Sequence, residues 1–236
     1  MPSPYLTIQL NARRFAGGLG VIAVLLVLAG LGVVYVRANS GPEAFRQITR
    51  QFDLDSEQNV PALFSTLLFF INSALLFLLG HRCAGKDEAG LRRYWLLLGG
   101  LFFFLGIDEN ISIHEMLIAF IRNRMGRPPG VFYFAWVIPY GIATALLAVV
   151  IIPWFRKLDG RTRWLFATSA VLFVSGALGM EMVAGRYLEI SHARDLNYQV
   201  MAVGEETLEM SGSILFTYSL TALLQKRDGQ VLAVFA

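Results

Sequence analysis

Six long apolar stretches alternate with short polar ones along the chain. They lie at about residues 16–36, 60–80, 94–121, 131–153, 164–185 and 199–225. Each stretch has about twenty residues or more, which is enough for a helix to cross the ~30 Å hydrocarbon core of a bilayer. We therefore expect an all-α fold: a polytopic membrane helical bundle of about six transmembrane helices, forming a single integral membrane domain over residues 1–236.

The basic residues between these stretches predict the orientation. Compact clusters such as Arg13–Arg14, Arg92–Arg93 and Arg156–Lys157 occupy every second polar segment, so they all lie on the same side of the predicted spans. Because cytoplasmic loops carry the excess of Lys and Arg, both the N-terminus and the C-terminus are expected in the cytoplasm. Aromatic residues close to span ends fit interfacial anchoring; they are Tyr94, Trp95, Tyr133, Trp136, Trp154 and Trp164.

The first span has two interpretations. Arg13 and Arg14, the apolar run and the small residues near Ala38 are also found in cleaved signal peptides. We favour an uncleaved anchor, because the apolar run is longer than the roughly 7–15 residues of a signal peptide.

An amphipathic segment at residues 40–58 follows the first span. Phe45, Ile48 and Phe52 share one helical face, so the segment is expected to lie on the outer membrane surface. Asp53, Asp55 and Glu57 alternate as at the start of a calcium loop. The glycine and the later glutamate of such a loop are missing, so we interpret these acids as a solvated loop and a helix cap.

Composition agrees with a membrane protein. Hydrophobic residues make up 56% of the chain and charged residues 16%, whereas soluble domains have about a quarter charged residues. The net charge of +3 indicates no nucleic-acid partner, because the distribution of Lys and Arg in a membrane protein reflects its orientation. The expected partners are membrane lipids, with other membrane subunits as further candidates. The single cysteine excludes an intrachain disulfide.

Seven acidic side chains interrupt three of the apolar stretches. An ionised side chain inside a bilayer costs several kcal/mol unless it is paired, so such residues are candidates for a functional site. Counting along the helices places all seven in one layer in the outer half of the membrane. They are Asp108, Glu109 and Glu115 in the third span, Glu181 in the fifth, and Glu205, Glu206 and Glu209 in the sixth.

Helical spacing predicts which acids face inward. Asp108 and Glu115 are seven residues apart and share a face, and Glu206 and Glu209 share another. Glu109 and His114 are turned about 100° from the first of these faces. We expect them to face other helices or to support the inward-facing acids.

The acids can be protonated, paired with arginine or bound to metal. Arginines predicted on the outer side give the structural alternative, a polar network without chemistry; they are Arg122, Arg124, Arg127, Arg186 and Arg194. Metal binding is favoured here because carboxylates on facing helices, with a histidine, build di-iron and di-manganese sites. The predicted ligands are Asp108, Glu109, His114, Glu115, Glu181, Glu205, Glu206 and Glu209.

Oxygen ligands with one imidazole favour a divalent metal, with iron or manganese first. Calcium and magnesium rank below these, as does copper, for which methionines near the acids would be the ligands. No haem is expected, because the chain has only three histidines, His81, His114 and His192.

Three classes of function remain open. The first is a metal-dependent membrane enzyme that acts on a lipid-soluble substrate, and the second is a proton- or cation-transport element. The third is an accessory or scaffold subunit of a membrane complex. The strings DENISIHE and EETLEMSG resemble motifs of bacterial multi-pass membrane proteins, which implies location in a bacterial cytoplasmic (inner) membrane.

Overall fold

The computed structural model describes residues 6–9, 11–41, 45–83, 89–228 and 231–235. Every element between Ala12 and Asp228 is helical, as the apolar stretches predict. The order is β1 (Leu6–Gln9), α1 (Ala12–Ser40), α2 (Arg46–Gln51), α3 (Val60–Arg82), α4 (Ala89–Ile111), α5 (Ile113–Met125), a 3-10 turn (Gly130–Phe132), α6 (Val137–Phe155), α7 (Gly160–Val174), a π-helical turn (Ser175–Met180), α8 (Glu181–Ser191), α9 (Leu196–Asp228) and β2 (Val231–Phe235).

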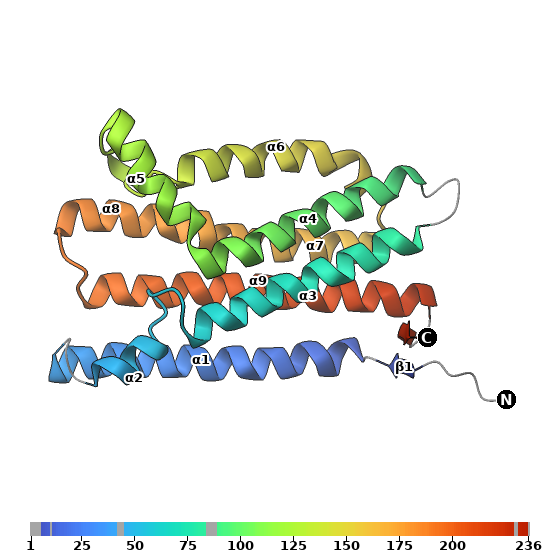
Figure 1. Ribbon diagram of the computed structural model, residues 1–236, viewed down its shortest axis with the longest axis horizontal. Coiled ribbons are helices and arrows are strands. Elements are labelled where there is room, and N and C mark those ends of the chain that lie inside the picture. The colour runs from blue at the N-terminus through green and yellow to red at the C-terminus, as the bar shows by residue number, and fades with distance from the viewer. Residues whose placement is uncertain (1–5, 10, 42–44, 84–88, 229–230, 236) are drawn as a thin grey trace.

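Five helical segments in the described part of the chain are long and apolar enough to cross a membrane. They are Ala12–Ser40, Val60–Arg82, Gly90–Ile111, Val137–Phe155 and Gly160–Ser191, the last combining α7, the π-helical turn and α8. Helix α9 is too polar to be counted with them, although its 33 residues run beside them for the length of the bundle (Figure 1). The sixth span and the orientation of the termini remain predictions.

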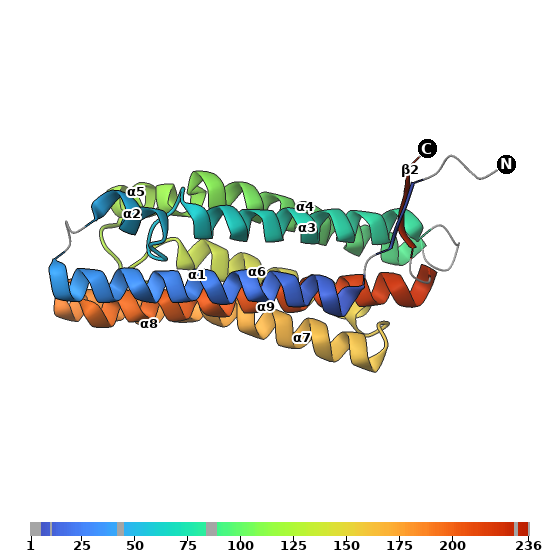
Figure 2. The same ribbon diagram turned by 90° about the horizontal axis from the view of Figure 1, so that it is seen from below.

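The long helices lie side by side in a bundle. Helices α3 and α4 pair closely, and α9 contacts α1, α3 and α7 (Figure 2). Strands β1 and β2 pair antiparallel at one end of the bundle. Helices α2 and α5 and the connection from α8 to α9 lie at the other end (Figure 1). We call this second end the acidic end, because the acids that interrupt the apolar stretches lie toward it.

Side-chain caps define where three helices begin. Asn11 Oδ1 accepts from the backbone N–H of Arg14, and Asn59 Oδ1 from that of Ala62. Asp159 Oδ1 accepts from the backbone N–H of Thr162. Each bond satisfies one of the N–H groups that a helix start leaves unpaired.

An aromatic cluster packs the bundle near the end that carries β1 and β2. Trp95 and Trp154 are 0% and 1% exposed, and their rings meet edge to face with centroids 4.8 Å apart. Both residues, like Trp136, were expected as interfacial anchors, and all three are buried; Trp164 is 73% exposed. Helix packing decides this, because an indole near a span end can point inward as well as toward the headgroups.

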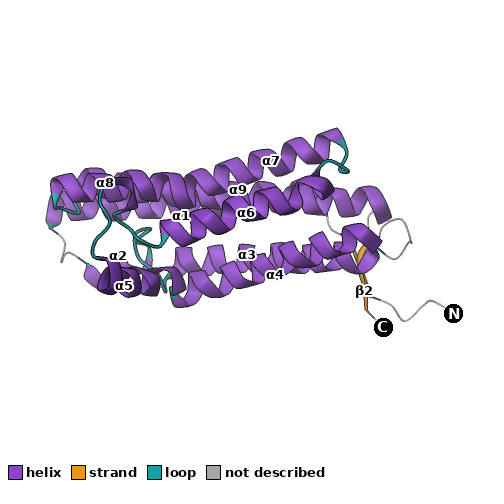
Figure 3. Cartoon of the chain, turned by 90° about the horizontal axis from the view of Figure 1, so that it is seen from above, coloured by secondary structure: helices purple, strands orange, loops and turns teal. Residues whose placement is uncertain are grey.

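Helix α6 packs differently from the others. Its buried residues are Val137 and Trp154, close to its two ends. The middle of α6 lies apart from α3 and α4 (Figure 3), and side chains of α4 and α6 face one cavity across this gap.

The segment at residues 40–58 is shorter as a helix than its pattern predicts. Helix α2 covers only Arg46–Gln51, and residues 42–44 lie outside the described part. Phe45 and Ile48 are exposed, whereas Phe52 of the same predicted face is half-buried and packs against the core. The location of this segment on a membrane surface remains a prediction. The acids that follow α2 are not a solvated loop, as the next subsections describe.

Candidate functional site

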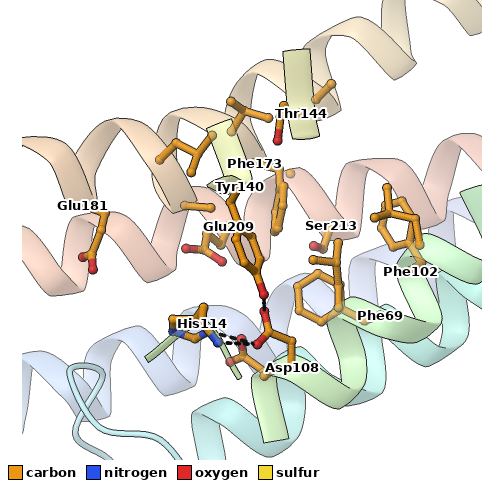
Figure 4. A pocket seen from close by; sticks show the side chains of 18 of the residues that line it. Phe69, Phe102, Asp108, His114, Tyr140, Thr144, Phe173, Glu181, Glu209 and Ser213 are labelled. Carbon is orange, nitrogen blue, oxygen red and sulfur yellow. Dashed lines mark hydrogen bonds and ion pairs between the residues drawn. The ribbon is translucent and has the colours of Figure 1, made fainter. Parts of the chain in front are cut away.

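A cavity of about 1270 Å³ lies between α4, α6, α7 and α9. Most of its wall is apolar, and its charged side chains gather toward one end, as Asp108, His114, Glu181 and Glu209 show in Figure 4. The apolar wall includes Leu97, Leu101, Leu147, Ile151, Phe166 and Phe173.

Acidic side chains outnumber basic ones in the cavity wall. Among the described residues, the basic side chains that line it are His114 and Arg194. The acids that line it include all seven acids of the sequence analysis and two from the connection between α2 and α3. They are Asp55, Glu57, Asp108, Glu109, Glu115, Glu181, Glu205, Glu206 and Glu209.

Asp108 holds together the break between α4 and α5. Ser112 has a left-handed backbone (φ 59°), which ends α4 and turns the chain. Asp108 Oδ1 accepts from the backbone N–H of His114 at 2.8 Å, and Oδ2 accepts from the Tyr140 hydroxyl at 2.8 Å (Figure 4). Asp108 is 4% exposed. Both oxygens of its carboxylate therefore accept hydrogen bonds from protein groups. Asp108 is a positioning residue, because these bonds hold His114 and Tyr140 in place.

His114 connects two acids from different parts of the chain. Its Nδ1 lies 3.3 Å from Asp108 Oδ1, and its Nε2 lies 3.1 Å from Glu57 Oε1. Burial lowers the pKa of the imidazole, but the hydrogen bonds to Asp108 and Glu57 outweigh burial and raise the pKa to about 10. His114 is therefore a cation at neutral pH. Its two ring nitrogens face carboxylates, so it is poorly placed as a metal ligand.

The break at Ser112 changes the expected arrangement of the third span. The helix predicted to run to residue 121 ends at Ile111. Asp108 and Glu115 consequently do not share a helical face, and Glu115 is exposed at the edge of the cavity. Glu109 and His114, expected to turn away, line the cavity.

Close packing of α7 on α9 places the remaining acids. A Cβ on Gly212 would lie 2.6 Å from the backbone nitrogen of Phe173, and one on Gly176 would lie 2.8 Å from the carbonyl oxygen of Glu205. Glycine at these positions lets the helices approach. The π-helical turn that includes Gly176 leads directly into Glu181, whose Oε1 accepts from Trp136 Nε1 at 3.0 Å.

Four acids form the centre of the charged part of the cavity wall, and we call them the core acids. They are Glu109 of α4 and Glu205, Glu206 and Glu209 of α9. Glu109 is within electrostatic range of Glu206, and Glu209 is within range of Glu109, Glu205 and Glu206. Glu57 is within range of Glu109 and Glu206. Oε2 of Glu57 and Oε2 of Glu206 are buried and have no hydrogen-bond partner among the described residues.

Three of the outer arginines bond to groups other than the core acids. Arg122 donates to the carbonyl oxygen of Tyr133, and Arg186 pairs with Glu189. Arg194 pairs with Asp55, whose pKa is raised by burial in spite of the arginine. Across the described ranges, no ion pair joins these arginines to Glu109, Glu205, Glu206 or Glu209. The arginine network considered as the structural alternative therefore does not neutralise the core acids.

In the arrangement of the structure, no group of three or more His, Cys, Asp or Glu among the described residues converges closely enough to hold a metal ion. The expected set of eight ligands is thus divided. Asp108, His114 and Glu181 bond to protein groups, Glu115 is exposed, and the remaining four acids line the cavity.

Comparison of the sequence with known proteins assigns the chain to a family. Residues 19–224, which include every acid of the cavity, match the family model described as Domain of unknown function (DUF8692). The chain belongs to this family. Neither a curated protein nor a solved structure matches the chain.

Three contributors to the site lie outside the residues chosen from the sequence. Glu57 belongs to a polar connection, whereas Trp136 and Tyr140 belong to an apolar stretch. The only sequence signal for Glu57 is the alternation of Asp53, Asp55 and Glu57. Nothing in the sequence distinguishes Tyr140 from an interfacial tyrosine.

Proposed function

We propose that this protein binds a lipid-soluble amphiphile within the membrane. The apolar part of the ligand occupies the cavity, and a head group that is cationic or donates hydrogen bonds lies against Glu109, Glu205, Glu206 and Glu209. The observation that carries the proposal is one cavity of about 1270 Å³ that joins an apolar wall to four carboxylates with which no described residue forms an ion pair.

The chemistry of the polar end supports such a head group. Ionised carboxylates accept hydrogen bonds and attract cations, and protonated ones also donate. Trp136, Tyr140 and Tyr198 line the same end, and aromatic faces attract organic cations. The wall between α4 and α6 is apolar, which suits the hydrocarbon part of a lipid.

A pair of probes of equal chain length tests the proposal. In nanodiscs, native mass spectrometry should detect dodecylamine bound to the protein with at least about tenfold higher affinity than dodecanoate, a difference of about 1.4 kcal/mol. Exchange of Glu209 for glutamine should reduce this preference. Equal retention of the two probes would contradict the proposed head group.

A second pair of variants tests where the ligand lies. Ala170→Trp places a large side chain in the cavity wall and should abolish retention of dodecylamine. Ala145→Trp is the matched control, because Ala145 is exposed on α6 and does not line the cavity. If both variants retain the amine as the wild type does, the cavity is not the binding site.

A divalent metal is the second candidate, favoured by the unpartnered, buried oxygens of Glu57 and Glu206. Rotation of these side chains together with Glu109 and Glu209 would supply oxygen ligands of the kind that manganese, ferrous iron, magnesium and calcium prefer. A bound metal would polarise a substrate or lower the pKa of water, which is the chemistry of a membrane metalloenzyme.

Elemental analysis separates the two candidates. If a metal is held, protein purified without added metal should contain close to one equivalent of iron or manganese, and the Glu206→Gln variant should contain less than about a tenth. The Glu115→Gln variant is the control and should keep the metal, because Glu115 is exposed. Less than a tenth of an equivalent of any divalent metal in the wild type would argue for the amphiphile alone.

A further inference from the structure

The acidic segment, residues 53–57, lies between α2 and α3 and is tied to three other parts of the bundle. Arg37 Nη2 of α1 lies 2.8 Å from Asp53 Oδ2, and Arg194 Nη1, between α8 and α9, lies 2.9 Å from Asp55 Oδ2. The third tie joins His114 Nε2 of α5 to Glu57 Oε1. The alternation of acids in the sequence thus becomes three ion pairs with three different elements.

The segment is also ordered from within. Asp53 Oδ1 accepts from the backbone N–H of Asp55, and Asp53 Oδ2 accepts from the hydroxyl of Ser56. Asn59 Nδ2 donates to the carbonyl oxygen of Asp53 at 2.6 Å while Asn59 Oδ1 caps α3. These bonds give the segment a fixed conformation.

Leu54 fastens the acidic segment to α1. It is 6% exposed, and a Cβ on Gly30 would lie 2.5 Å from Leu54 Cδ1. Glycine at position 30 therefore leaves room for Leu54 to dock. The ion pair of Arg37 with Asp53 lies about two helical turns further along α1, so the segment is held to this helix at two points.

The other side of the segment faces the cavity. Asp55, Ser56 and Glu57 line it, next to Glu109 and Glu206. The segment thus lies between the core acids and the surface of the acidic end.

We propose that the acidic segment is a closure that separates the core acids from water at the acidic end and opens when its ion pairs to Arg194 and His114 break. The role of this closure rests on the proposed function: a closed aqueous end leaves the gap between α4 and α6 as the route for a ligand dissolved in the membrane. The closure itself can be tested without any ligand.

The test measures access of water to the cavity. Cys83, the only cysteine, is replaced by serine, and Ala202, a buried residue of the cavity wall, is replaced by cysteine. The protein is placed in nanodiscs and treated with a charged methanethiosulfonate reagent, which enters through water and not through lipid.

The expected result is faster labelling when the segment loses two charges. With Asp55→Asn and Glu57→Gln added, the thiol introduced by Ala202→Cys should react at least about tenfold faster than in the protein with the native segment. A cationic reagent makes the test conservative, because removal of two acids weakens its attraction to the site. Arg186→Gln is the matched control: it removes an exposed ion pair at the same end that does not involve the segment. Its labelling rate should not change.

Two results would overturn the closure: fast labelling with the native segment, or no acceleration in the double variant. If the double variant does not fold, Arg194→Gln replaces it. This change removes the ion pair with Asp55 by altering the arginine instead of the acid, and it should accelerate labelling severalfold. Dodecylamine retention measured on the same proteins distinguishes the two proposals. If the proteins retain dodecylamine but the double variant is labelled no faster, the closure is refuted and the proposed function stands. If the double variant is labelled faster but no protein retains dodecylamine, the proposed function is refuted and the closure stands.

Discussion

Replacement of Asp108 by alanine should cost about 3–5 kcal/mol of stability, the loss typical when one partner of a buried charged pair is removed. The variant leaves the His114 backbone N–H and the Tyr140 hydroxyl without their acceptor and weakens the pairing of the His114 cation. The start of α5 and the contact of α4 with α6 depend on these bonds. Thermal unfolding in detergent, followed by tryptophan fluorescence, measures the effect.

Asp108→Asn separates the hydrogen bonds from the charge. The amide keeps the shape and one acceptor, so we expect a loss of about 1.5–3 kcal/mol, the range for hydrogen bonds to a charged group. Glu115→Gln is the control on the far side of the break and, as an exposed substitution, should change stability by less than about 0.5 kcal/mol. Equal losses for Asp108→Ala and Glu115→Gln would mean that the break is not held by Asp108.

Replacement of Gly212 by alanine should destabilise the protein by roughly 3 kcal/mol, the upper part of the range for overpacking. The added Cβ would lie 2.6 Å from the Phe173 backbone nitrogen and 2.9 Å from the Ser169 carbonyl oxygen. Both contacts are with backbone atoms, so α7 as a whole must move away from α9. The yield of monodisperse protein and its unfolding temperature should both fall.

Gly204→Ala on the same helix is the matched control. A Cβ there would meet only the flexible end of Met180, at 3.5 Å. Alanine is also the better helix former by about 0.5–1 kcal/mol, so this variant should be as stable as the wild type or more stable. If Gly212→Ala behaves in the same way, α7 and α9 do not approach each other closely at Gly212.

The sequence predicts the parts of this protein that depend on hydrophobicity along a helix. Long apolar runs and the cost of charge in a bilayer predict five helical segments that are long and apolar enough to cross a membrane, and they predict that Glu181, Glu205, Glu206 and Glu209 gather around one cavity. These properties are local, because length and charge are read from consecutive residues.

Structural features that depend on contacts between residues far apart in the chain cannot be predicted from the sequence. Ser112 gives no signal of a helix break, since serine occurs inside many membrane helices; the break is stabilised by Asp108, which accepts from His114. Glu57 looks solvated because its neighbours are polar, whereas its partner His114 lies 57 positions later in the chain. The directions of Trp95 and Trp154 are decided by helices that meet only after folding.

The cluster of Trp95, Trp154 and Phe166 has a consequence for exchange. Trp154 and Phe166 form the floor of the cavity, and Trp95 packs edge to face on both. A molecule that reaches this floor meets a packed aromatic wall and must reverse. If the cavity binds the proposed amphiphile, the ligand cannot pass out through this aromatic end, and exchange with a second molecule has to take place elsewhere along the cavity.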